Sequence, residues 1–353
     1  MNTLCRHFGT CGGCTFQDMD LADYRVLKQA QILRALERHG LGGVPVDLPL
    51  VVAPTTRRRA ALAAVKQDGV ASIGFRSARS HAVVDMLECR ILTPSLAGLI
   101  PGLRELLTAL LREGEEARLE ITEADNGVDI GLKLKRSIDV AAIAALARWA
   151  GSSRVARIVV NGEPAVQLRE PVVCLAGVEV GLPPDSFLQP TREGEAFLQE
   201  CVQRAMKGAV AVADVFAGCG TFAFALAGTT RVHALDSDSA ALSALTFAAR
   251  RTARLKPVTA ETRDLFKRPL QARELDRFDG IVLDPPRAGA FAQARTAAAS
   301  KVARIAYVSC NPESFARDAR VLVEGGHRIE WVVAVDQFLW SAHIELAALF
   351  RWH

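Results

Sequence analysis

The pattern of apolar and polar residues changes character about halfway along the chain. In the first half, one helical pattern runs over residues 28–39 and stops at Gly40. Short strand-like segments follow, separated by Gly, Asn and Asp, the residues that form tight turns. These segments are residues 60–66, 70–76, 128–134 and 157–160. Short strands joined by such turns predict an α+β domain with a mainly antiparallel sheet over residues 1–184.

The second half alternates strand-like apolar runs with helical segments. Two clear helical segments cover residues 240–251 and 314–324, and the second ends at a pair of glycines. Strand–helix alternation predicts a mostly parallel sheet with helices on both faces, here over residues 185–353. The strand-like runs are residues 210–216, 232–235, 280–283, 304–309, 329–335 and 344–350.

Composition narrows the class of protein without naming an activity. A length of 353 residues suits two domains, and a formal net charge of +4 permits nucleic acid as a partner without requiring it. No apolar run approaches the roughly 18 residues of a membrane span, and the N-terminus lacks the apolar region of a signal peptide. We therefore expect a cytoplasmic protein with no membrane association and no obligate protein partner.

The segment over residues 213–222, A-D-V-F-A-G-C-G-T-F, places an acid at a strand end and a glycine pair before a helix. Glycines let the backbone approach a ligand closely at the carboxyl edge of such a sheet. The next strand ends in a second acid about twenty residues later, where a carboxylate can accept the hydroxyls of a ribose. A glycine turn with surface acids is the alternative. The candidate cofactor-binding residues here are Asp214, Phe216, Gly218, Gly220, Asp236 and Asp264.

Two later strands end in motifs that contain candidate catalytic residues. Residues 284–289 read D-P-P-R-A-G, and residues 309–312 read S-C-N-P. Cys310 therefore leaves a strand at the edge where the cofactor is expected, which suits a nucleophile. A buried structural cysteine is the alternative, and it is the commoner role of an isolated cysteine.

Taken together, these segments resemble the RNA uracil-C5 methyltransferase family. Residues 187–189 resemble the family's F-x-Q segment, and residues 336–345 resemble its closing D-x-F…H-x-E segment. The resemblance follows the order of the whole chain. It implies a class I, Rossmann-like S-adenosylmethionine-dependent methyltransferase domain, with Gln189 contacting the methyl donor and Asp284 shaping the donor and base pocket.

The resemblance also assigns chemical roles to two residues. The Cys310 thiolate would add to C6 of uracil, and C5 of the resulting enolate would attack the methyl group of S-adenosylmethionine. Glu345 would then remove the C5 proton so that the thiolate can leave. This sequence departs from several family members at Leu339-Trp340, where those members have a proline. The departure affects the loop before Glu345 but keeps the residue.

Four of the eight cysteines have the spacing of a metal site: Cys5-x5-Cys11-x2-Cys14, with Cys89 far downstream. The spacing suits either zinc or a [4Fe–4S] cluster, and the family resemblance favours the cluster. Basic residues near these cysteines are expected to contact RNA phosphates, with a solvated basic face as the alternative. They are Arg57, Arg58, Arg59, Lys66, Arg76, Arg79 and Arg90.

The resemblance leaves the substrate open between two RNAs. A short chain with the cysteine quartet resembles the family's 23S rRNA enzymes, and tRNA is the second candidate. We expect the chain to lack the N-terminal RNA-binding barrel of some members. A DNA cytosine-C5 methyltransferase is disfavoured because Arg287, not cysteine, follows Pro286. A non-catalytic metal-stabilised RNA-binding protein is the remoter alternative. It would require a vestigial cofactor site that no longer binds the cofactor.

Overall fold

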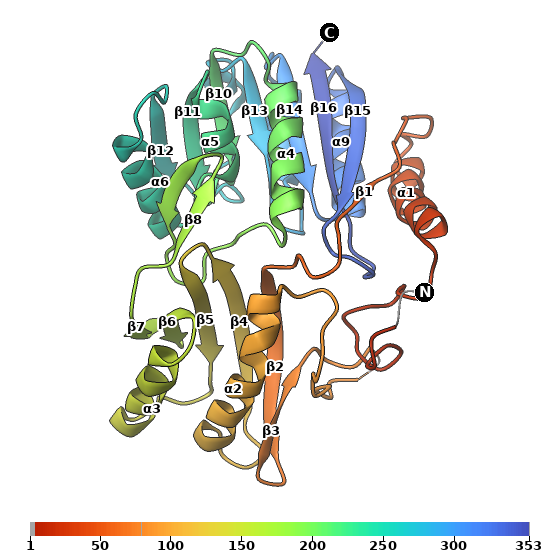
Figure 1. Ribbon diagram of the computed structural model, residues 1–353. Helices are drawn as coiled ribbons and strands as arrows, with labels where there is room; N and C mark the ends of the chain where they lie inside the picture. The colour runs from red at the N-terminus through yellow and green to blue at the C-terminus, as the bar shows by residue number, and fades with distance from the viewer. Residues whose placement is uncertain (1–3, 79, 353) are drawn as a thin grey trace.

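The computed structural model describes residues 4–78 and 80–352 and contains two main sheets. The larger sheet lies above the smaller one in Figure 1, with a short hairpin between them. This hairpin consists of β8 (Val172–Leu175) and β9 (Val178–Gly181).

The larger sheet has eight strands in the order β1-β15-β16-β14-β13-β10-β11-β12. Only β16 runs antiparallel to its neighbours, and every other pair is parallel. The mostly parallel sheet predicted for the second half is therefore confirmed. The strands are β1 (Leu50–Val51), β10 (Ala211–Val215), β11 (Arg231–Asp236), β12 (Val258–Thr262), β13 (Gly280–Leu283), β14 (Arg304–Ser309), β15 (His327–Asp336) and β16 (Glu345–Trp352).

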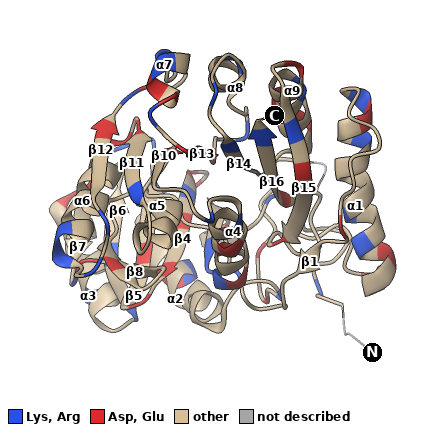
Figure 2. Ribbon diagram, turned by 90° about the horizontal axis from the view of Figure 1, so that it is seen from above, with Lys and Arg blue, Asp and Glu red and all other residues tan. Residues whose placement is uncertain are grey.

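Helices cover both faces of the larger sheet (Figure 2). One apolar core joins α4, α5 and α6 to one face, and includes Leu198, Phe222 and Leu245. The other core joins α1, α8 and α9 to the opposite face, and includes Ile32 and Phe315. The helices are α1 (Leu21–Arg38), α4 (Arg192–Ala205), α5 (Thr221–Ala227), α6 (Ser239–Arg251), α7 (Ala272–Leu275), α8 (Phe291–Ala298) and α9 (Pro312–Glu324).

The smaller sheet has six strands in the order β3-β2-β4-β5-β6-β7, and only β5 and β6 pair in parallel. The antiparallel character predicted for the first half is confirmed. Two helices pack on this sheet, and neither was predicted. The elements are β2 (Arg59–Gln67), β3 (Val70–Gly74), α2 (Pro94–Leu110), β4 (Glu116–Ala124), β5 (Gly127–Lys133), α3 (Val140–Gly151), β6 (Val155–Val160) and β7 (Glu163–Gln167).

The expected boundary at residue 184 needs a correction, because the first residues of the chain join the larger sheet. Helix α1 buries Ile32 and Leu36 in the same core as the central strands. Strand β1 pairs in parallel with β15, with Leu50 opposite Val335. The amphipathic face of α1 needs an apolar partner, and the larger sheet provides it. Among the described residues, no helix is both long and apolar enough to cross a membrane.

Candidate active site

A cavity of about 450 Å³ lies at the carboxyl edge of the larger sheet. This is where α/β folds of this kind place their ligands, because the loops that follow parallel strands meet there. Seven of the ten residues predicted to be catalytic or cofactor-binding line it: Gln189, Phe216, Gly218, Asp236, Asp284, Cys310 and Glu345.

The glycine turn after β10 forms one wall of this cavity. Gly218 and Gly220 have positive φ angles of 52° and 100°, and a Cβ on Gly220 would lie 2.8 Å from the ring of Phe224. The Gly218 amide donates a hydrogen bond to Asp236 Oδ2 at 2.9 Å. The other oxygen of Asp236 accepts from the Asp238 amide at 2.9 Å. These bonds tie the ends of β10 and β11 together and fix the carboxylate at the cavity.

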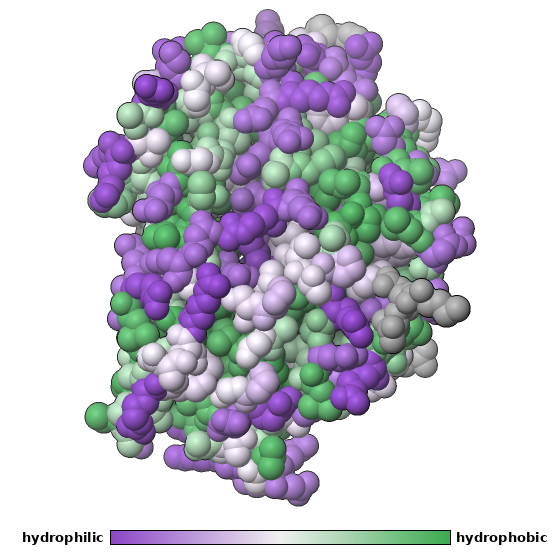
Figure 3. Space-filling model, viewed as in Figure 1, coloured by the Kyte–Doolittle hydropathy of each residue, from purple (hydrophilic) through white to green (hydrophobic). Residues whose placement is uncertain are grey.

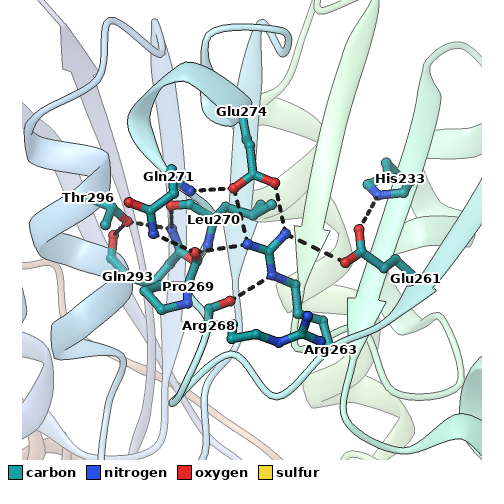
Figure 4. Close-up of polar contacts among 10 residues, drawn as sticks. All are labelled: His233, Glu261, Arg263, Arg268, Pro269, Leu270, Gln271, Glu274, Gln293 and Thr296. Atoms are coloured by element: carbon teal, nitrogen blue, oxygen red, sulfur yellow. Dashed lines mark hydrogen bonds and ion pairs between the residues drawn. The ribbon is translucent and has the colours of Figure 1, made fainter.

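The loop after β12 forms a second wall and is held by the polar network of Figure 4. The Arg263 guanidinium donates to both oxygens of Glu274, at 2.8 and 3.0 Å. It also donates to the carbonyls of Arg268 and Pro269. This pairing lowers the pKa of Glu274 to about 2. The network orders the loop that brings Leu265 and Phe266 to the cavity.

Three predicted cofactor contacts lie outside the cavity lining. Asp264 accepts hydrogen bonds from the backbone of Phe266 and Lys267, so it shapes its own loop. Gly220 caps α5. Asp214 is fully buried, and neither of its carboxylate oxygens has a hydrogen-bond partner among the described residues. Burial and the nearby Asp284 raise the pKa of Asp214 to about 8.

Cys310 lies between the end of β14 and the start of α9. Asn311 caps this helix by accepting a hydrogen bond from the Glu313 amide at 3.1 Å. The Asn311 side chain also donates to the Arg287 carbonyl at 3.0 Å, and Ser314 Oγ donates to the same oxygen at 3.1 Å. The two loops that carry the D-P-P-R and S-C-N-P motifs are thereby fixed to each other.

Three ionisable groups of the cavity have raised pKa values. Burial, with Glu345 and Asp284 nearby, raises the pKa of the Cys310 thiol to about 11, although Arg287 opposes the shift. Burial and then Asp284 raise the pKa of Glu345 well above its usual range. Burial and then Asp236 raise the pKa of Asp284 to about 7. A carboxyl group with a raised pKa is a stronger base when ionised, which suits proton removal.

A chain of side-chain hydrogen bonds connects Glu345 to the F-x-Q segment. Gln337 Nε2 donates to Glu345 Oε2 at 3.2 Å and to Gln189 Oε1 at 2.7 Å. The backbone carbonyl of Gln189 accepts from Arg58 Nε at 3.1 Å. Gln337 was not singled out from the sequence, although it lies inside the recognised closing segment. Its contacts orient the carboxyl group of Glu345.

The loop over residues 337–344 is anchored to α1 by a buried ion pair that the sequence did not reveal. Lys28 Nζ lies 3.2 Å from Asp336 Oδ1, and both side chains are 0% exposed. The Tyr24 hydroxyl donates to Asp336 and accepts from the Trp340 amide at 2.7 Å. Lys28 also donates to the carbonyl of His343. These contacts fix both ends of the loop that leads to Glu345.

The four predicted metal-ligating cysteines lie together. Cys5, Cys11, Cys14 and Cys89 line one hollow, together with apolar side chains that include Phe75. Burial, and then the neighbouring thiols, raise the pKa of Cys14 to about 12. In the part of the chain that the structure describes, no three His, Cys, Asp or Glu side chains are arranged to hold a metal ion. The residues thus fit a thiolate-bound metal in number and type, but not as a formed ligand shell.

The basic residues around the cysteines do not form the free surface that was expected. Most are engaged within the protein, because acids, carbonyls and aromatic rings lie beside them. Arg58 is 1% exposed and pairs with Glu195 at 2.6 Å. Arg57 lies over the rings of Phe75 and Phe338. Arg59, Lys66, Arg76 and Arg90 contact Glu120, the Thr108 carbonyl, Glu116 and Glu88, and Arg79 lies outside the described residues.

A mostly parallel sheet covered by helices on both faces, with a glycine turn and an acid at its carboxyl edge, is typical of S-adenosylmethionine-dependent methyltransferases. The sequence profile of the tRNA (uracil-5-)-methyltransferase family matches residues 181–352. An uncharacterized RNA methyltransferase of Rhizobium meliloti is 42% identical over 98% of this chain and 84% of its own length. The chain belongs to the RNA (uracil-5-)-methyltransferase family.

Two further relatives have named substrates. The 23S rRNA (uracil(1939)-C(5))-methyltransferase RlmD of Chromohalobacter salexigens is 32% identical, with 97% of this chain and 74% of the relative covered. The crystal structure of Pyrococcus abyssi tRNA (uracil-54, C5)-methyltransferase in complex with S-adenosyl-L-homocysteine superposes with a TM-score of 0.76. That comparison has 25% identity and covers 98% of this chain and 86% of the other. These similarities support S-adenosylmethionine as the methyl donor.

The burial of Asp214 predicts a specific pH dependence of stability. An aspartate in the unfolded chain ionises near pH ~3.9, whereas Asp214 in the folded chain ionises near pH 8. Between these values the folded state binds the extra proton, so the free energy of unfolding falls as pH rises. Asp214→Asn removes this contribution, and its urea midpoint is expected to fall less than that of the wild type between pH 5 and pH 8.

The exposed Asp47 provides a matched control, because Asp47→Asn removes the same charge from the surface. Its urea midpoints are expected to follow the wild type at both pH values. Parallel curves for Asp214→Asn and the wild type would contradict the assignment of a raised pKa to Asp214.

Proposed function

We propose that this enzyme methylates C5 of a uridine in 23S rRNA, with Cys310 as nucleophile and Glu345 as general base. The observation that carries the proposal is that both residues line the cavity that also holds the glycine turn and Asp236. A nucleophile, a base and a donor site must meet at one pyrimidine ring, and the residues proposed for these three roles all line this cavity.

In the proposed reaction, the Cys310 thiol first loses its proton, and the thiolate adds to C6 of uracil. The addition makes C5 a carbon nucleophile, which takes the methyl group and releases S-adenosylhomocysteine. Glu345 then removes the proton from C5, and the electrons of that bond expel the thiolate from C6. The products are 5-methyluridine, S-adenosylhomocysteine and the original thiol, with one proton released.

The cavity residues divide between donor and base. Asp236 is held by two backbone amides at the end of β11, a position that suits the ribose hydroxyls of the donor. Gln189 is proposed to contact the donor from the opposite wall. Phe187 is 58% exposed at the cavity, where an aromatic ring can stack on a uracil base removed from its helix.

Ribosomal RNA is the first choice of substrate for two reasons. The relative named for 23S rRNA is 32% identical over nearly the whole chain. The cysteine quartet is the feature by which the sequence resembles the rRNA members of the family. Transfer RNA is the second candidate, and the similarity to the Pyrococcus tRNA enzyme supports it.

We further propose that Cys5, Cys11, Cys14 and Cys89 hold a [4Fe–4S] cluster. Four thiols that line one largely apolar hollow support this proposal, because such thiols need a cation to become stable thiolates. When bound, the cluster would fix the N-terminal segment, and no step of methyl transfer requires its redox chemistry. This segment already contacts the active-site loop, since the amides of Thr15 and Phe16 donate to the Trp340 carbonyl.

The nucleophile is tested with RNA in which 5-fluorouridine replaces uridine. Fluorine does not leave C5 as a proton does, so the reaction is expected to stop after methyl transfer as a covalent protein–RNA adduct on a denaturing gel. Cys310→Ala should abolish the adduct. The exposed Cys174 provides the control, and Cys174→Ala should form the adduct at the wild-type rate.

The RNA that forms the adduct identifies the substrate. A 23S rRNA fragment is expected to react, and a tRNA transcript run in parallel is expected to react more slowly. An adduct that persists in Cys310→Ala would contradict the assignment of the nucleophile. An adduct with tRNA alone would contradict the choice of ribosomal RNA.

The cluster is tested by metal analysis of protein purified without oxygen. The wild type is expected to contain about four iron and four sulfide per chain, as the [4Fe–4S] formula requires. The double variant Cys11→Ser/Cys14→Ser should lose both, while Cys174→Ser should retain both. Zinc without sulfide in the wild type, or iron retained by the double variant, would contradict the proposal.

A further inference from the structure

A second hollow meets Cys310 from outside the main cavity. It has a volume of about 210 Å³ and lies between α1 and the start of α9. Cys310 and Arg287 line both hollows, so the nucleophile separates the donor cavity from a cleft that no step described above uses. Figure 2 shows basic segments on α1, beside α9.

The two hollows differ in charge. Asp236, Asp284 and Glu345 line the donor cavity, where Arg287 is the one basic residue. The second hollow is lined by Arg34, Arg38 and Arg287, against the single carboxylate of Glu313. A phosphate group would meet Arg287 beside three carboxyl groups on the first side, and Arg287 together with Arg34 and Arg38 on the second.

The acid of the second hollow is already neutralised. Arg38 forms an ion pair with Glu313, and His39 Nε2 lies 3.9 Å from the same carboxylate. Arg34 is exposed and forms no ion pair with any described residue. The backbone of Arg287 is held by Asn311 and Ser314, while its side chain stays exposed. Arg34 and Arg287 therefore present two guanidinium groups, free of ion pairs with the described residues, in the hollow that Cys310 also lines.

We propose that the cleft between α1 and α9 binds the RNA phosphates that flank the target uridine, through Arg34 and Arg287. This inference rests on the proposed function. The uracil ring must reach Cys310, and its ribose and phosphates must leave the site through an opening that tolerates negative charge. Guanidinium groups match phosphate oxygens in geometry as well as in charge. The donor and the RNA thus approach the nucleophile from opposite sides.

The proposal is tested by the affinity of the RNA that forms the 5-fluorouridine adduct, measured at several salt concentrations. Arg34→Ala is expected to weaken binding roughly tenfold at low salt and to reduce the salt slope by about 1, as for one lost phosphate contact. Binding of S-adenosylhomocysteine should not change. Alanine is a good helix former, so α1 should persist in this variant.

Two further variants sharpen the comparison. Arg250→Ala removes an exposed arginine from α6, which lies at the other end of the sheet from α1 (Figure 1), and should keep the wild-type RNA affinity. Glu313→Gln frees Arg38 from its ion pair and should tighten RNA binding about threefold.

An uncharged methylphosphonate beside the target uridine should weaken binding to the wild type and have no further effect on Arg34→Ala.

The outcomes separate this inference from the proposed function. If the wild type forms the adduct but Arg34→Ala binds RNA like Arg250→Ala, the phosphate site is wrong and the uracil chemistry stands. If the wild type forms no adduct with either RNA, the proposed function fails, and the phosphate site fails with it. A selective loss in Arg34→Ala that matches the methylphosphonate effect supports both.

Discussion

The buried ion pair between Lys28 and Asp336 is the contact on which the arrangement of the active site most depends. It joins the first helix of the chain to the end of β15, where the loop that leads to Glu345 begins. Tyr24 completes the contact by bonding to both Asp336 and Trp340. Removing one partner of a buried pair leaves an uncompensated charge, which costs about 3–5 kcal/mol. Helix α1 therefore belongs with the larger sheet and its candidate active site, although the smaller sheet separates it in sequence from the other elements of that sheet.

Three parts of the protein contact the loop over residues 337–344. The segment after Cys14 bonds to the Trp340 carbonyl, Gln337 links Glu345 to Gln189, and Arg57 lies over Phe338. The segment that leads into β2, the segment after Cys14 and the chain before α4 thus all contact one short loop. Hydrophilic residues gather near the middle of the face in Figure 3, at the level where the two sheets meet. A polar junction of this kind suits a charged RNA substrate better than an apolar ligand.

Much of the fold and of the candidate site could be predicted from the sequence. Strands β13 and β14 begin and end at the predicted residues, because buried parallel strands read as continuous apolar runs between turn residues. Helices α2 and α3 were missed, although their apolar faces are regular. The cavity residues at strand ends could be predicted because they lie within short, recognisable sequence motifs.

The residues that could not be predicted act through tertiary contacts. Lys28 reads as an ordinary surface lysine of an amphipathic helix, and only the packed structure shows that it is fully buried on Asp336. Asp214 was placed at the cofactor because its motif contains an acid, but its strand position turns it into the core. Arg58 was expected on the surface for its charge, and a buried acid, Glu195, determines its position instead.

The central claim is that Cys310 and Glu345 act at successive steps on one uracil ring. The most direct test uses Glu345→Gln with unsubstituted RNA and S-adenosylmethionine, followed by mass spectrometry of the Cys310 peptide. Without the base, the enzyme should transfer the methyl group but keep the nucleotide, so the peptide should carry a methylated uridine adduct. Release of 5-methyluridine at the wild-type rate, or an adduct without the methyl group, would contradict the account.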